Sequence, residues 1–198
     1  MLTPTVITSP AKEPITVEEA CDHAAIADVD GASNRMSLCI KAAREMFERH
    51  TGRTVHETTY EFVLDSWPSG PLVLPRATPL LSVTSVTYKD SSGTETTVSS
   101  SLYVLDTWEV PGRIALAYSE SWPSFTPYPV SPIRVRYVAG IAASPATECD
   151  ATTKQAVAML AAAYFENREA EILTENVSQI VMKIFRQMIE DKIVERVY

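Results

Sequence analysis

The sequence contains little of what several large classes of protein require. Only three cysteines, Cys21, Cys39 and Cys149, occur in 198 residues, and their odd number and wide spacing argue against a disulfide scaffold. Basic residues are the minority: 17 lysines and arginines face 25 acidic residues, which gives a formal charge of −8. A protein that grips nucleic acid tightly needs a basic face. We therefore expect a reduced, intracellular protein that touches nucleic acid transiently at most.

Long hydrophobic runs are also missing. The longest apolar stretch, residues 156–165, is ten residues long, well short of the ~20 that a helix needs to cross a bilayer. The first residues show neither the basic start nor the apolar run of a signal peptide. We expect a soluble, cytosolic protein without a membrane partner.

Proline is plentiful, but mainly in the middle of the chain. Nine of the 13 prolines lie between Pro68 and Pro132, and none follows Pro145. Because proline lacks a backbone N–H and has a fixed φ angle, this central segment should hold short strands and turns. The flanking segments remain free to form helices.

A capping box marks the first helix. Residues 1–13 are expected to form an extended tail. After it, the Thr16 hydroxyl can accept a hydrogen bond from the N–H of Glu19, while the Glu19 carboxylate reaches back to Thr16. This helix should run to about Asp28.

A second helix is predicted to begin at Ser33 or Asn34 and to end at Gly52, a residue type that favours helix ends. Its apolar residues recur at spacings of three and four, which is the pattern of an amphipathic helix. They are Met36, Cys39, Ile40, Ala43, Met46 and Phe47.

From Arg53 to Gly140 the apolar period changes to two, which is typical of strands. In the last of these strands Arg134 and Arg136 should face one side and the alternating apolar residues the other. The strand candidates are 60–64, 72–74, 83–88, 102–105, 113–118 and 133–137. Short strands separated by turn residues favour an antiparallel sheet or a small barrel.

Helices return at the end of the chain. An alanine-rich helix is predicted over residues 151–168, and Thr174 or Asn176 should cap a last helix. The last helix carries a continuous apolar stripe: Val177, Ile180, Val181, Ile184, Met188 and Ile189, extended by Ile193, Val194 and Val197. Such a stripe must be buried either by its own subunit or by a neighbour.

Together these segments predict an α+β fold, in which two N-terminal and two C-terminal helices form a core that carries a central antiparallel β insertion. The predicted divisions are an extended tail over 1–13, a helical hairpin over 14–52, the β insertion over 53–140, and the C-terminal helices over 150–198.

Groups that could bind a metal or act as a nucleophile are few. Cys21 and His23 are two residues apart in a predicted helix, so they do not share a face. No second Cys/His pair completes a tetrahedral zinc site. Cys39 lies on the apolar stripe of the second helix, which favours a buried thiol over a nucleophile.

Acidic pairs give a similarly weak signal for catalysis. Glu57, Glu61 and Asp65 alternate along a predicted strand and could line a hydrolytic cleft. The same alternation is found in any half-buried strand, so a structural role is the simpler interpretation. The sequence contains no phosphate-binding glycine loop and no Gly-x-Ser-x-Gly turn. We expect no catalytic residue, metal or cofactor.

The order of the short motifs resembles that of the head–tail connector proteins of tailed phages, also called adaptor or head-completion proteins, including the adaptors of phage-like gene transfer agents. The resemblance covers roughly residues 13–170. The motifs that carry it are PITVEEA (14–20), AARE (42–45), TGR (51–53), LDSWP (64–68), LVLPR (72–76), PLLSV (79–83), VTY (86–88), PGRI (111–114), WP (122–123), VRYVAG (135–140) and YFENRE (164–169).

This resemblance implies a structural protein of the virion neck that is assembled in the bacterial host cytoplasm. The family forms a twelve-fold homo-oligomeric ring beneath the portal protein. The ring extends the DNA channel and receives the stopper or tail-terminator proteins. No enzymatic activity, metal or cofactor is implied.

The resemblance also directs attention to the C-terminal residues. The C-terminal segment of the family tends to dock on the portal, although residues 172–198 depart from the expected proline-containing ending. The expected portal or oligomer contacts are Ile184, Phe185, Met188, Ile189, Ile193, Val194, Val197 and Tyr198. Independently of the resemblance, four arginines could touch channel DNA or a neighbouring subunit: Arg44, Arg53, Arg134 and Arg136. Salt-bridged surface arginines are the simpler interpretation of these residues.

Two other classes of function are compatible with the sequence. One is a different structural module, such as a tail-completion or adhesion protein that uses the β region. The other is a hydrolase, which would need a deep pocket that unites at least two of five groups: Glu57, Glu61, Asp65, His23 and Cys39.

Overall fold

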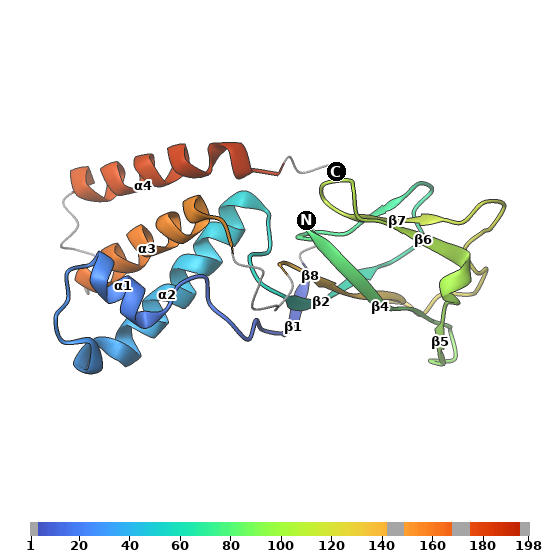
Figure 1. Ribbon diagram of the computed structural model, residues 1–198. Coiled ribbons are helices and arrows are strands. Elements are labelled where there is room, and N and C mark those ends of the chain that lie inside the picture. Colours follow the sequence, from blue (N-terminus) through green and yellow to red (C-terminus); the bar gives the residue numbers. More distant parts are fainter. Residues whose placement is uncertain (1–3, 142–148, 168–174, 195–198) are drawn as a thin grey trace. The chain divides into compact units, whose positions relative to one another are not determined.

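The structure is a computed structural model that describes residues 4–141, 149–167 and 175–194. The chain folds into two compact units, a β unit of residues 4–10 and 57–141 and a helical unit of residues 11–56, 149–167 and 175–194 (Figure 1). The strands belong to the first unit and the α-helices to the second. The predicted α+β class is therefore confirmed.

The first helix, α1 (Val17–His23), begins with the predicted capping box. The N–H of Glu19 donates to Thr16 Oγ1 over 3.2 Å, and the N–H of Thr16 donates to Glu19 Oε2 over 2.7 Å. The prediction that this helix runs to about Asp28 is wrong. The helix ends at His23 because the chain turns there and Asp28 already begins the next helix.

The second helix, α2 (Val29–Thr51), starts earlier than Ser33 or Asn34, so those predicted caps are wrong as well. Asp28 is the N-cap: its Oδ1 accepts from the N–H of Gly31 over 3.0 Å. Aspartate caps helices as well as serine or asparagine does. At the other end Gly52 takes the left-handed conformation, with φ of 72°, as the sequence predicted.

Helices α3 (Ala151–Glu166) and α4 (Glu175–Ile189) follow, and a short 3₁₀ turn, η2 (Glu190–Lys192), comes after α4. Asn176, one of the two predicted caps of the last helix, lies inside α4; Thr174 lies outside the described residues. Helix α3 packs against α1, α2 and α4. The helical core is made of Met36, Ile40, Ala43, Phe47, Ala156, Val157, Leu160, Ala161, Phe185 and Ile189.

The β unit contains two antiparallel sheets. The order of the larger sheet is β1 (Thr5–Thr8), β2 (Thr58–Leu64), β8 (Ile133–Ala139), β4 (Leu80–Lys89) and β5 (Glu95–Thr97). The order of the smaller sheet is β3 (Leu72–Val73), β7 (Arg113–Leu116) and β6 (Tyr103–Asp106), and the 3₁₀ turn η1 (Ser100–Leu102) precedes β6.

Part of the expected N-terminal tail is an edge strand. Strand β1 pairs with β2, with Thr5 opposite Glu61 and Val6 opposite Tyr60. All four residues of β1 are exposed, so backbone pairing holds the strand in place rather than burial of side chains. The sequence gives no local sign of this pairing because β2 lies about fifty residues further along the chain.

The core of the β unit follows the predicted alternation. In β8 Ile133, Val135 and Tyr137 are fully buried, and the intervening Arg134 and Arg136 are exposed. The rings of Tyr137 and Tyr60 stack with their centroids 5.6 Å apart. Burial raises the pKa of Tyr137 above its ordinary value, so the hydroxyl stays protonated and donates to the carbonyl of Pro75.

A long loop, residues 117–132, is fixed to this unit by aromatic rings. Trp122 stacks on Trp67 with 4.5 Å between centroids and an interplanar angle of 6°. The ring centroids of Phe125 and Tyr88 are 4.6 Å apart, and Trp67 Nε1 donates to the carbonyl of Pro123 over 3.1 Å. The loop is therefore ordered without strands of its own.

Candidate interaction surfaces

The structure separates the four arginines that the sequence singled out. Arg44 is buried, with Nε 2.8 Å from Glu13 Oε2 and Nη1 3.0 Å from Glu48 Oε2. Burial acts to lower the pKa of Arg44, but the carboxylates of Glu48 and Glu13 outweigh it and the pKa of the guanidinium is raised. Arg53 Nε donates to the carbonyl of Lys192 over 2.7 Å. The side chains of Arg44 and Arg53 are therefore both engaged in contacts within the helical unit.

The other two arginines lie on the exposed face of the larger sheet. Arg136 Nη2 pairs with Glu61 Oε2, directly across from it on β2, over 2.8 Å. Arg134 is exposed and forms no ion pair with any residue that the structure describes. Arg134 thus forms no ion pair in the described chain, and its side chain is exposed, whereas the side chain of Arg53 is held by the Lys192 carbonyl.

Helix α4 divides the predicted portal contacts into buried and exposed residues. Phe185 and Ile189 are fully buried in the helical unit, and Met188 and Val194 are partly buried. Ile184 and Ile193 are exposed, at 44% and 50%. Val197 and Tyr198 lie outside the described residues. The stripe predicted from the sequence thus has one edge in the core and one edge in solvent.

Ile180, which the sequence analysis did not select as a contact residue, extends the exposed edge. It is 57% exposed and stands one helical turn before Ile184. The i, i+4 spacing places the two side chains on the same face of α4. Among the side chains of α4 that the structure describes, these two isoleucines are the exposed large apolar ones.

The segment after α4 is tied to the end of α2 and the start of α3. Lys192 Nζ lies 3.0 Å from Asp150 Oδ1, and the N–H of Val194 donates to the carbonyl of Thr51 over 2.8 Å. Burial acts to raise the pKa of Asp150, but its hydrogen bonds with Lys192 and Thr153 prevail and lower it. The described segment from the end of α4 to Val194 is therefore part of the helical unit.

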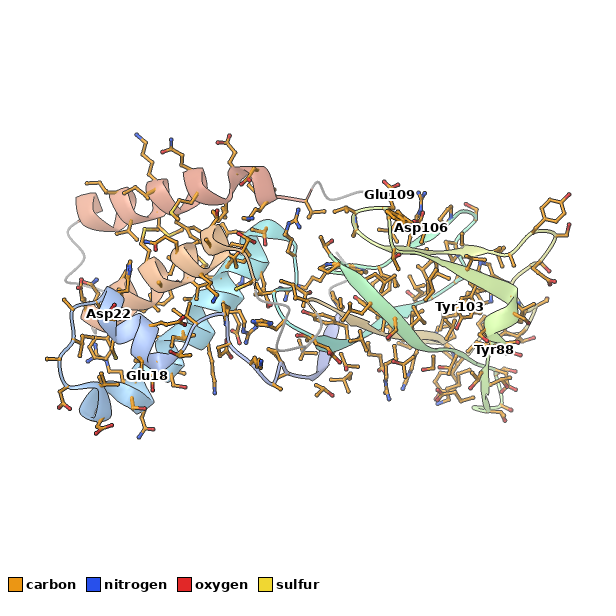
Figure 2. All side chains as sticks on the ribbon, viewed as in Figure 1. Glu18, Asp22, Tyr88, Tyr103, Asp106 and Glu109 are labelled. Carbon is orange, nitrogen blue, oxygen red and sulfur yellow. The ribbon has the colours of Figure 1, made fainter. Side chains whose placement is uncertain are left out.

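The turn between β6 and β7 presents a tryptophan that the sequence analysis did not identify. Trp108 is 94% exposed and Val110 is 49% exposed. Asp106 and Glu109 mark this turn in Figure 2. Asp106 Oδ2 accepts from Arg113 Nε over 2.9 Å, and this hydrogen bond is the main reason that the pKa of Asp106 is lowered. The sequence shows the turn, but not that its tryptophan lies outside the core.

Helix α1 carries an acidic surface of the helical unit. Glu18, Glu19 and Asp22 are exposed, and Glu18 and Asp22 extend from the helix in Figure 2. Hydrogen bonds from the backbone and from Thr16 lower the pKa of Glu18, so it is charged at neutral pH. This surface fits the net charge of −8.

The groups considered for catalysis do not form a common site within the units described. Cys39 and His23 belong to the helical unit, and Cys39 is buried there, whereas Glu57, Glu61 and Asp65 belong to the β unit. Glu61 is paired with Arg136, and Asp65 Oδ1 accepts from the N–H of Ser131 over 3.1 Å. Among the described residues no three His, Cys, Asp or Glu side chains are placed to hold a metal ion.

Helices long and apolar enough to span a membrane are also absent from the described part of the chain.

Solved structures share this fold along the whole chain. A chain in the neck of an empty GTA particle computed with C6 symmetry superposes with a TM-score of 0.79. Chains in the virion of a native gene transfer agent (GTA) particle and in the neck of a native GTA particle computed with C12 symmetry superpose with TM-scores of 0.76. Each match covers 100% of this chain and 98% of that chain, at 22% identity.

At this identity the likeness establishes the fold, and it confirms at that level the predicted resemblance to phage-like neck proteins. Neither the protein-family models nor the curated proteins give a match to the sequence.

Proposed function

We propose that the protein is a structural subunit of the neck of a tailed, phage-like particle. In this proposal it is the adaptor: twelve copies form a ring beneath the portal, extend the DNA channel, and receive the stopper or tail-terminator proteins. The observation that carries the proposal is the fold match to GTA neck chains, which spans both units and nearly the full length of each chain compared. The role needs no catalytic residue, metal or cofactor.

The surfaces of the subunit support this role. The exposed pair Ile180 and Ile184 on α4 offers an apolar contact for the portal or for a neighbouring copy. Arg44 and Arg53 are engaged inside the helical unit, so these two arginines are not free to hold DNA. A mildly acidic channel wall would repel the DNA phosphates and let DNA slide through without sticking.

The proposal is tested by assembly. The full-length protein should be co-expressed with the portal protein of the same particle and examined by electron microscopy. We expect a ring of twelve copies attached to one end of the portal, and particles made without this protein should lack tails. Absence of any portal-bound ring, together with normally tailed particles in the deletion strain, would contradict the proposal.

A further inference from the structure

We propose that neighbouring copies in the ring are joined by a contact between the β6–β7 turn of one copy and Arg134 of the next. In this contact the indole of Trp108 lies over the Arg134 guanidinium, and Glu109 forms an ion pair with it. The inference rests on the proposed function, because it names the contact that would close the ring.

The first half of the contact is a prearranged turn. Asp106 Oδ1 accepts from the N–H groups of Trp108 and Glu109, over 3.2 and 3.3 Å, and Asp106 Oδ2 accepts from Arg113 Nε over 2.9 Å. These bonds fix the backbone from which Trp108 projects with 94% of its surface exposed. A tryptophan on a fixed turn loses little conformational entropy on binding, and exposed tryptophans of this kind often dominate protein interfaces.

The second half is an exposed arginine that forms no ion pair with any residue in the described part of the chain. Arg134 lies opposite Val63 on β2 and Thr87 on β4. Its neighbour on the same face, Arg136, is neutralised by Glu61 over 2.8 Å. A guanidinium in this position can accept an aromatic ring on its planar face and a carboxylate at its edge.

Charge complementarity favours a second copy as the occupant. Glu109 stands beside Trp108 and is only loosely engaged, 3.6 Å from Arg113 Nη2. The turn thus offers a ring and a carboxylate, which are the two groups that Arg134 can bind at once.

The geometry of the β unit also fits a contact between copies. The turn belongs to the smaller sheet and Arg134 to the larger one. The contact joins two different groups of residues, as a heterologous interface does, and a heterologous interface that is repeated by rotation closes a ring. C12 symmetry was used for the GTA neck that has this fold.

A charge-swap experiment on the full-length protein, co-expressed with its portal protein, tests the inference. Ring formation is measured by native mass spectrometry and electron microscopy for Trp108→Ala, Arg134→Glu and the double variant Glu109→Lys/Arg134→Glu. The matched controls are Tyr118→Ala, which removes an aromatic side chain that is 98% exposed, and Lys41→Glu, which reverses an exposed charge on α2. Circular dichroism melting confirms that each variant is folded.

We expect Trp108→Ala and Arg134→Glu each to raise the concentration needed for half-assembly about tenfold or more, and the double variant to recover most of that loss. Both controls should assemble normally. As a second readout, Glu109→Cys combined with Arg134→Cys should give a disulfide-linked ladder of subunits under oxidation. The native cysteines are buried, so they should not contribute to the ladder.

The outcomes separate this inference from the proposed function. Normal rings from both single variants, or rings without the disulfide ladder, would overturn the inference and leave the adaptor role standing. A wild-type protein that forms no ring with the portal would overturn the adaptor role, and this contact with it.

Discussion

Arg44 and Arg134 show how the same residue type occupies opposite environments in this chain. Arg44 is buried between Glu13 and Glu48, and removing one member of such a group typically costs about 3–5 kcal/mol because a buried charge is left unpaired. Arg134 is exposed with no carboxylate beside it in the described chain, so its replacement should scarcely change stability. A loss of assembly caused by Arg134→Glu can therefore be ascribed to an interface.

Gly112 is required by a close approach rather than by a turn. A Cβ atom at this position would collide with the side chain of Leu80, which is buried in the core of the β unit. We predict that Gly112→Ala lowers the free energy of unfolding by about 1–3 kcal/mol, the usual cost of overpacking. Urea denaturation measures it. Gly70→Ala is the control, because nothing lies within 4 Å of a Cβ built there; equal effects of the two substitutions would contradict the explanation.

His56 should make the stability of the helical unit depend on pH. Burial lowers the pKa of His56 below its ordinary 6.5, and the charges of Lys12, Arg44 and Lys154 lower it further, against a hydrogen bond with the backbone of Glu13. A lowered pKa means that the unfolded chain binds a proton first as the pH falls. Stability is therefore complete above pH 6.5 and decreases below it, towards the folded pKa.

We predict that His56→Gln flattens this dependence. Urea unfolding between pH 7.5 and 5 should show the wild type losing stability, relative to the variant, with a slope of at most about 1.4 kcal/mol per pH unit. Parallel curves for the two proteins would show that His56 does not titrate in this range.

At the scale of elements, α4 has one face directed into its own unit and another directed outward. Phe185 and Ile189 complete the helical core, whereas Ile180 and Ile184 are exposed. The hydrogen bond from the Val194 N–H to the Thr51 carbonyl holds the end of this segment to the end of α2. The helix is therefore part of the helical unit without a partner, and in the proposed adaptor role only its outer face would be available for docking.

This division leads to opposite effects of two substitutions in neighbouring residues. Phe185→Ala should lower the free energy of unfolding by about 3–5 kcal/mol, because it leaves a cavity in the core. Ile184→Lys should change stability by less than about 0.5 kcal/mol and yet weaken association with the portal. Thermal melting and co-purification with the portal protein measure the two effects. An Ile184→Lys variant that binds the portal normally would remove α4 from the portal interface.

At the scale of the whole molecule, local signals predicted much of the fold. The capping box at Thr16 and Glu19, the helix end at Gly52, and the alternation of β8 were all read correctly, because each depends on residues close together in the chain. The start of α2 was misplaced because Asp28 and Ser33 are equally good caps by residue type.

The features that the sequence could not supply depend on contacts between distant segments. The pairing of β1 with β2 joins segments about fifty residues apart. The apolar pattern of α4 does not tell which of Ile184 and Phe185 is buried in the helical unit, since both fit the helical period. The exposure of Trp108 likewise depends on how the smaller sheet is packed. The residue type alone does not tell whether a tryptophan is buried or exposed.

The connectivity of the two units has a mechanical consequence. The chain passes between them after Pro10, again after His56, and once more between Ile141 and Cys149. The two units are joined by more than one chain segment. A tensile load applied to one unit would therefore be shared among several covalent connections. A cut in the last of these connections would leave α3 packed against α1, α2 and α4, so the helical unit would stay together.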